Sequence, residues 1–304
     1  MPVPHVATAF GDLLDKRVTK IFYDTYDQLP SLIPTMYSME TSSDETERWS
    51  SVGALPQFTE FTGSVSYSSQ AQGYDTTATH LEWANGIQIE RKLYDDDRHG
   101  IWERRPSGLA ISANRTREVH GARLFNLGFS VDTRFSTNTE AVALFSNSHT
   151  TTSGASTATG FDNLVTSALS ATALAASRIQ MRGFRDDQAE RINVMPSMLL
   201  YPPDLYDIAY EIVESSGKPG VATNDKNVHM GKFRLVEWNY LTDTNNWFMI
   251  DESAMKEYVV WFERIPLEFA FAEEIDTIIA KWRAYMRYSM GWFDWRWGMG
   301  AQVT

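Results

Sequence analysis

Few residues in this sequence have side chains that could catalyse a reaction, and their spacing does not match a catalytic motif. Ser146, Ser148 and His149 stand together in the segment LFSNSH, and serine with histidine is the nucleophile and base pair of many hydrolases. Side chains this close in sequence cannot easily face each other, no G-x-S-x-G turn is present, and no acid is placed to orient the ring. The cluster therefore argues against a hydrolase.

The sequence also lacks a recognisable metal-binding or cofactor-binding motif. Asp95, Asp96 and Asp97 are three adjacent carboxylates, but adjacent side chains point in different directions and no EF-hand or zincin spacing surrounds them. A metal site stays open as an alternative, but the run fits a solvated turn or a helix N-terminus, where acids complement the dipole. His120 is expected to be a surface or interface histidine. The absence of cysteine excludes disulfides and thiolate sites, and no nucleotide-binding glycine motif occurs. We expect no metal, no cofactor and no enzyme activity.

The amino-acid composition indicates a folded protein that does not bind nucleic acid tightly. The 304 residues are 43% hydrophobic and 13% aromatic, enough to bury a substantial core. A formal charge of −12 and a pI near 5.0 oppose tight binding to DNA, which needs clustered Lys and Arg. The N-terminus lacks the apolar run of a signal peptide, and no window reaches the length of a membrane helix. We expect neither export nor a membrane partner.

The first half of the chain contains elements that lack partners of their own. A helix is predicted over residues 6–28, followed by an extended arm from Pro30 to Glu47 that has little core and needs a neighbour to lie on. Residues 48–90 favour two strands, with the Ser/Thr/Gln/Gly-rich stretch Ser66 to Thr79 as the tip between them. Because a lone hairpin is marginally stable, we infer that another subunit stabilises it. The alternative is a surface hairpin folded onto its own domain.

The remaining elements suggest a compact mixed domain behind one long helix. That helix is predicted from Leu109 to Phe125, with a narrow apolar stripe suited to lying across a sheet. Further predictions are a Ser/Thr/Gly linker at 150–159, helices at 164–181 and 204–215, and strands at 195–201, 232–240 and 247–250. Val259, Val260 and Phe262 are expected in another strand, followed by an alternating segment from Ile265 to Phe271 and a strand or helix at 275–290. The tryptophans near the C-terminus are expected to pack in the core or between subunits.

Four motifs occur in an order that resembles one family. They are Arg48 to Gly63 (RWSSVGALPQFTEFTG), Trp83 to Arg91 (WANGIQIER) leading to the aspartate run, Leu144 to His149, and Leu199 to Pro203 (LLYPP). The corresponding family patterns are an aromatic–leucine–proline segment ending in glycine, a strand ending in arginine before an acid pair, a phenylalanine–small–x–x–His element before a glycine-rich linker, and an apolar strand ending in two prolines. Over roughly residues 5–300 the chain resembles the major head subunits of Mu-like tailed bacteriophages.

The resemblance implies an α+β fold, the tailed-phage major capsid fold. Its parts would be an N-terminal arm at 1–47, an extended two-stranded loop at 48–92, a peripheral domain with the long spine helix at 93–155 and 256–304, and an axial domain at 156–255. The implied function is a major capsid protein that assembles into hexamers and pentamers as the icosahedral head around double-stranded DNA. An encapsulin-like protein compartment of the same fold is the alternative.

The resemblance also names partners and contact residues. Besides itself, the chain would meet a separate scaffolding protein, a portal, decoration proteins and weakly held DNA, in a virion capsid assembled in the cytoplasm of the host bacterium. The residues expected at subunit contacts are Phe58, Phe61, Tyr67, Tyr74, Arg91, Arg115, Arg117 and Glu118. Some relatives cross-link subunits through a loop lysine, but residues 50–91 contain none. We therefore expect no such cross-link.

Overall fold

The computed structural model describes residues 8–65, 67–90, 104–218, 225–274 and 279–304. Helices and strands are mixed along the chain, as the resemblance implied. The helices are α1 (Thr8–Gln28), α2 (Ile33–Met36), α4 (Arg104–Asn126), α5 (Ala171–Met181), α6 (Tyr206–Glu214) and α7 (Glu252–Tyr258), with a 3-10 turn η1 (Pro203–Leu205) before α6. The strands are β1 (Ser38–Thr41), β2 (Thr46–Val52), β3 (Gln72–Thr79), β4 (Leu81–Glu90), β5 (Ser136–Asn138), β6 (Leu164–Val165), β7 (Met198–Tyr201), β8 (Arg234–Glu237), β9 (Trp247–Ile250), β10 (Val259–Glu274), β11 (Ile279–Trp292) and β12 (Gly298–Ala301).

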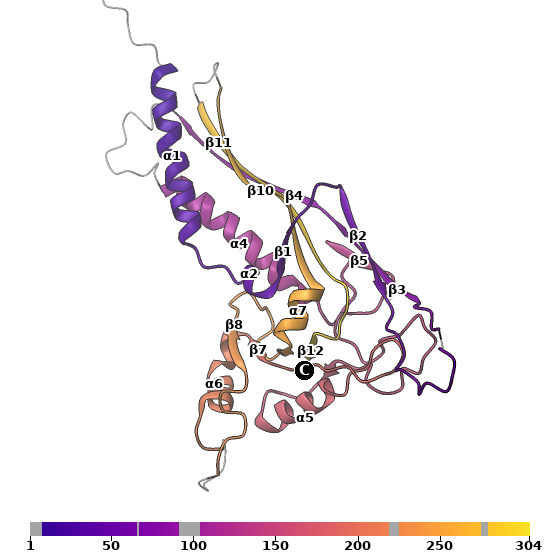
Figure 1. The fold of residues 1–304 in the computed structure, drawn as a ribbon. Coiled ribbons are helices and arrows are strands. Elements are labelled where there is room, and N and C mark those ends of the chain that lie inside the picture. The colour runs from indigo at the N-terminus through magenta and orange to yellow at the C-terminus, as the bar shows by residue number, and fades with distance from the viewer. Residues whose placement is uncertain (1–7, 66, 91–103, 219–224, 275–278) are drawn as a thin grey trace, which may run out of the picture.

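Two long strands, β10 and β11, pair antiparallel and run through the upper half of the molecule (Figure 1). Strand β4 pairs antiparallel with β11, and β1 from the N-terminal segment pairs in parallel with β10. Helices α1 and α4 pack against each other beside this sheet, with Phe22 of α1 stacked on Phe269 of β10 at 4.3 Å between ring centroids. The long helix predicted at Leu109 to Phe125 is confirmed as α4, although it begins earlier.

The lower half is built on a five-stranded sheet in the order β6-β12-β9-β7-β8. All residues of β7 (MLLY) and β9 (WFMI) are buried, which is what strands covered on both faces require. Helix α6 lies beside β8 and α5 beside β12. Trp247, Trp295 and Trp297 are all buried in the same core, so core packing explains the aromatic C-terminus.

The segment from Pro30 to Glu47 lies on its own chain, contrary to the expectation that it needs a neighbour. Ile33, Met36 and Tyr37 are buried in the main core. The Tyr37 hydroxyl donates to the Gly121 carbonyl of α4 at 2.7 Å, and a Cβ at Gly121 would lie 3.2 Å from side-chain atoms of Ile33 and Trp238. Glycine therefore permits a close approach of the arm to α4.

The hairpin tip lies earlier than predicted. The stretch Gln72 to Thr79, expected at the tip, is strand β3, paired with β2 on one side and β5 on the other. The projecting segment is residues 53–71, and the return strand of the hairpin is β3, whereas β4 belongs to the β10–β11 sheet. The stem is folded onto its own chain, because Trp49 of β2 stacks on Phe262 and packs against the tilted ring of Phe293.

Several other boundaries differ from the predictions. The helix expected at 164–181 begins only at Ala171, after the strand β6, because the Ser170 hydroxyl accepts the Ala173 amide as an N-cap. Helix α7 was not predicted, although Asp251 caps it by accepting the Ser253 and Ala254 amides. The segment predicted as strand or helix at 275–290 is strand where it is described, from Ile279 onward. The Asp95–Asp97 run and Arg91 lie outside the described residues.

Within the described ranges, no helix combines the length and apolar character that crossing a bilayer would require.

Candidate functional site

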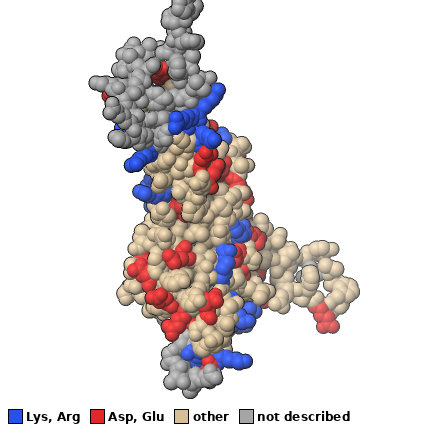
Figure 2. Space-filling view, turned by 90° about the vertical axis from the view of Figure 1, so that its left-hand side faces the viewer, with Lys and Arg blue, Asp and Glu red and all other residues tan. Residues whose placement is uncertain are grey.

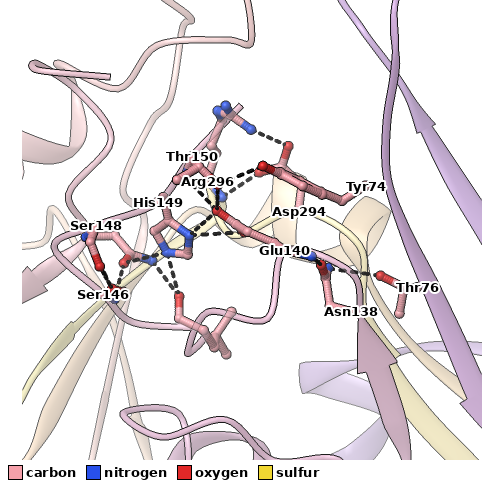
Figure 3. Close-up of polar contacts among 12 residues, drawn as sticks. Tyr74, Thr76, Asn138, Glu140, Ser146, Ser148, His149, Thr150, Asp294 and Arg296 are labelled. Atoms are coloured by element: carbon pink, nitrogen blue, oxygen red, sulfur yellow. Dashed lines mark hydrogen bonds and ion pairs between the residues drawn. The ribbon is translucent and has the colours of Figure 1, made fainter. Parts of the chain in front are cut away.

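The cluster around His149 is a buried network of polar contacts (Figure 3). The ring is 1% exposed and stacks on Trp295 at 4.3 Å between centroids. Its Nδ1 lies 3.2 Å from Oε1 of Glu140, so the expectation that no acid adjoins this histidine is wrong. The serines point elsewhere, since Ser146 Oγ pairs with Ser148 Oγ at 3.0 Å. With both ring nitrogens engaged and no serine against either, the cluster is not a nucleophile–base pair.

The hydrogen-bond partners of His149 define where its protons lie. Nε2 faces two acceptors at 3.2 Å, the Leu144 carbonyl and Asn163 Oδ1, so this nitrogen carries a hydrogen. On the other side of the ring, Nδ1 lies 3.2 Å from Oε1 of the buried Glu140 carboxyl. Glu140 also accepts the Thr150 amide at 2.7 Å, and Asn163 donates to the Gly298 carbonyl at 3.1 Å. The network thus ties the segment 140–150 to β12.

Among the described residues, large exposed apolar side chains gather on residues 53–65 and 67–71, here called the projecting loop. Its apolar side chains face solvent, with Phe58 and Tyr67 almost fully exposed and Phe61 70% exposed. Glu60 is its single charged residue. Exposed contiguous apolar residues in a folded protein mark a surface that another molecule covers. Among the described residues, the loop thus presents several large apolar side chains to solvent.

Polar contacts hold the base of the projecting loop. The Ala54 amide donates to Asp187 Oδ1 at 2.7 Å, and Gln57 Nε2 donates to Glu190 Oε2 at 2.8 Å. On the other limb, Thr152 donates to the Gln72 carbonyl at 2.8 Å, and the Tyr74 hydroxyl pairs with Thr150 at 2.6 Å. The stretch 150–159, expected as a flexible linker, has no regular structure but is fixed at these points. Hydrogen bonds on both limbs thus hold the base of the loop in place.

Two residues expected at subunit contacts have partners inside the chain. Arg117 makes a two-pronged ion pair with Glu263, with both distances 2.7 Å, and its guanidinium lies over the Trp261 ring. Glu118 is 3% exposed and accepts hydrogen bonds from Ser31 and from Trp238 Nε1, at 2.6 and 2.9 Å. Both side chains stabilise the subunit's own fold. Figure 3 shows Tyr74 also engaged internally.

The sequence itself matches a known family model. Residues 73–299 match the model of the phage capsid protein family. The chain belongs to the phage capsid protein family. No curated protein sequence matches it significantly.

Solved structures agree on the fold of this capsid protein. The mature capsid of bacteriophage PhiM1 aligns with a TM-score of 0.58 at 8% identity, covering 91% of this chain and 88% of that one. The procapsid of bacteriophage JBD30 aligns at 0.53 and 13% identity, covering 97% and 76%. The capsid of cyanophage P-SCSP1u aligns at 0.54 and 13% identity, covering 91% of each. At such identities the likeness establishes the fold, which is that of tailed-phage capsids.

These findings fix the class of the protein. It is a structural capsid protein of the virion and not an enzyme, and an encapsulin-like compartment is not favoured. The match is to phage capsid proteins as a whole and does not single out the Mu-like group. Among the described residues, no set of three or more His, Asp or Glu side chains could hold a metal ion.

Proposed function

We propose that this capsid protein is the major shell subunit of a tailed bacteriophage and assembles into hexamers and pentamers of an icosahedral head around double-stranded DNA. The observation that carries the proposal is the projecting loop. It exposes Phe58, Phe61 and Tyr67 on a segment whose base is fixed by hydrogen bonds. An exposed aromatic surface held in one geometry is suited to anchor a contact with a second copy.

The surface that receives the loop is proposed to be the flank of α4. A groove of about 170 Å³ lies between α4 and the β4–β11 sheet, lined by uncharged residues that include Ala84, Ser112, Thr116 and Met286. The loop carries one charged residue, Glu60, and the groove carries none, so their contact would bury no ion pair. Arg115, exposed on α4, stays a proposed contact residue beside this groove. Arg91 keeps the same proposed role but lies outside the described residues.

Charge supports only weak contact with packaged DNA. The chain carries a net charge of −12. On the face shown in Figure 2, the described Lys and Arg side chains occur in separate groups and form no continuous basic surface. Because DNA affinity grows with the number of phosphates neutralised, such a surface would not grip the genome.

The other partners and the division into domains are part of the same proposal. The shell would be assembled with a separate scaffolding protein, a portal and decoration proteins in the cytoplasm of the host bacterium. The chain would divide into an arm at 1–47, an extended loop at 48–92, a peripheral domain at 93–155 and 256–304, and an axial domain at 156–255. Strand β12, within the second peripheral segment, pairs with β6 and β9 and so connects the two domains.

Electron microscopy of purified particles tests the function. We expect closed particles of uniform size by negative stain when the chain is expressed with its phage's other head proteins, with this chain as the most abundant component of the particle. Particles that lack the chain, or that contain it as a minor component, would contradict the proposal. Particles holding an enzyme cargo in place of DNA would favour the compartment instead.

A further inference from the structure

Helix α6 presents an exposed face that has no partner in the subunit. Tyr206 and Tyr210 lie one turn apart, 47% and 53% exposed, with their rings stacked at 6.0 Å. Asp207 and Glu211 lie beside them with the same spacing, and α6 contains no Lys or Arg. Figure 2 looks onto the side of the molecule that carries α6, and Asp and Glu gather in its lower half. The face is aromatic and acidic.

Helix α5 carries the opposite character. Its exposed residues include Ile179, 71% exposed, flanked by Arg178 on the helix and Arg182 at its C-cap, while α5 contains no Asp or Glu. The two arginines are four positions apart, as are Asp207 and Glu211 on α6. Within the described part of the chain, none of these four charges forms an ion pair. Two exposed faces of opposite charge and matching spacing are therefore left open on one subunit.

Their positions in the fold suit a contact between copies. The five-stranded sheet runs in the order β6-β12-β9-β7-β8, with α6 packed beside the edge strand β8 and α5 beside β12, towards the opposite edge. Figure 1 shows α6 at the lower left of the molecule and α5 apart from it, across the lower end. A contact between two different faces of one chain is heterologous, and repetition of such a contact closes a ring when the rotation permits.

We propose that α6 of one capsid subunit docks against α5 of the next copy around a capsomer. Tyr206 and Tyr210 pack against Ile179, while Asp207 and Glu211 pair with Arg178 and Arg182. The occupant is a second copy of this chain because the complementary face is present on the chain itself. The inference rests on the proposed shell function, in which each subunit has a neighbour on both sides. Complementary charge would fix which faces meet and in which register.

Charge reversal tests the pairing. Asp207→Arg with Glu211→Arg, and separately Arg178→Glu with Arg182→Glu, should each reduce the yield of capsomers at least about tenfold in native mass spectrometry, because like charges then meet. Both reversals in one chain restore opposite charges at every contact and should recover the yield. The control is Asp44→Arg with Glu45→Arg, which lies on an exposed loop distant in sequence from α5 and α6. It changes the net charge by the same amount as the α6 reversal and should leave the yield of capsomers unchanged.

Cysteine cross-linking provides an independent readout, because the natural chain contains no cysteine. A chain with Tyr210→Cys and Ile179→Cys should give, after mild oxidation of capsomers, disulfide-linked multimers beyond the dimer on a non-reducing gel. Each single-cysteine chain should stay monomeric, since neither helix meets its own counterpart in a heterologous contact. Circular dichroism confirms that each variant is folded.

The outcomes separate the interface from the function. Normal capsomers from both reversed chains, a combined variant as defective as either reversal, or dimers from a single-cysteine chain would each overturn the interface while leaving the shell function intact. Cross-linking of Tyr210→Cys to a different head protein in intact particles would do the same. A wild-type chain absent from the particle shell would overturn the proposed function and this interface with it.

Discussion

At the scale of single residues, buried polar groups hold this capsid subunit together. Glu118 joins three parts of the chain, since it accepts from Ser31, from the Leu32 amide and from Trp238 Nε1. A charged group on a predicted helix is expected to face solvent, and the sequence carries no signal that this one faces the arm. Its partners lie far apart in the chain, so only the folded structure brings them together.

Removing this acceptor should destabilise the subunit. Glu118→Ala leaves the buried Trp238 donor without a partner, which costs about 1–3 kcal/mol, and removes the acceptor of the half-buried Leu32 amide. Urea unfolding of the subunit measures the free energy of unfolding. Arg115→Ala, exposed on the same helix, is the matched control and should change that free energy by less than about 0.5 kcal/mol. Equal effects of both substitutions would contradict the role of Glu118.

The His149–Glu140 pair makes a similar prediction. His149→Ala removes the histidine partner of the Glu140 carboxyl, which is 3% exposed and keeps only its contacts with Thr150. Losing one partner of a buried polar group costs about 1–3 kcal/mol. We expect a lower midpoint in urea and a smaller amount of soluble subunit. Ser148→Ala, one residue away and exposed, should behave as wild type. Retention of full stability by the His149 variant would show that the network is dispensable.

His120 links stability to pH. Burial, with the positive charges of Arg134 and Arg123, lowers the pKa of His120 from its ordinary 6.5 to about 4. Between these values the unfolded chain binds a proton that the folded chain does not, so this contribution to stability is present above 6.5 and is lost as the pH falls towards about 4.

The variant His120→Gln should remove this contribution while still offering an acceptor towards the Tyr288 hydroxyl, now 2.7 Å from Nδ1. Thermal unfolding of wild type and variant between about pH 7 and about pH 4.5 makes the comparison. As the pH falls, we expect the melting temperature of the wild type to decrease more than that of the variant. A difference that stays constant across this range would refute the assignment.

At the scale of elements, the projecting loop explains why the sequence predicts the hairpin tip too late in the chain. Phe58, Phe61, Val65 and Tyr67 have the residue types of a strand, yet they are exposed on the loop. In the proposed shell they contact a neighbouring subunit, and residues that pack between subunits have the same types as residues that pack within one. The polar stretch at Gln72–Thr79 forms a strand because threonine is a good strand residue, and Thr76 and Ala78 on one face are buried. Hydrophobicity alone cannot distinguish contacts within a subunit from contacts between subunits.

Local signals predicted most of the remaining elements. The apolar spacing at Leu109 to Phe125 and the buried run at Leu199–Tyr201 correspond to α4 and β7. Ser170 and Asp251 were readable cap signals for α5 and α7 and would have corrected both regions. The parallel pairings of β1 with β10 and β6 with β12 have no local signal, because their partners are far apart in the chain.

The loop predicts an assembly defect that leaves folding intact. Phe61→Asp carries a charge into the proposed contact with a neighbour, so closed particles should be lost while circular dichroism of the subunit is unchanged. Ala84→Asp, in the groove beside α4, should give the same defect from the receiving side. Phe61→Leu keeps the site apolar and should retain most of the particle yield. Normal yield from Phe61→Asp would count against the contact.

At the scale of the whole molecule, the shell should be held without covalent bonds from the loop. Residues 50–91 contain no lysine, so this segment cannot supply the amine of an isopeptide bond. Boiled particles should therefore run as a single band of monomer on a denaturing gel. A ladder of multimers that survives boiling and reductant would contradict this expectation.

The pairing of β1 with β10 also constrains when a subunit can exist. Ser38 lies opposite Val260, and the same sheet is completed by β11, so an early segment of the chain forms its hydrogen bonds only with a late one. A ribosome must therefore release the chain through β11 before this sheet can form, and contacts so distant in sequence fold slowly. A nascent chain that has not yet reached β10 has no partner for β1. A copy interrupted before that point therefore lacks the sheet and differs in fold from the subunits of a shell.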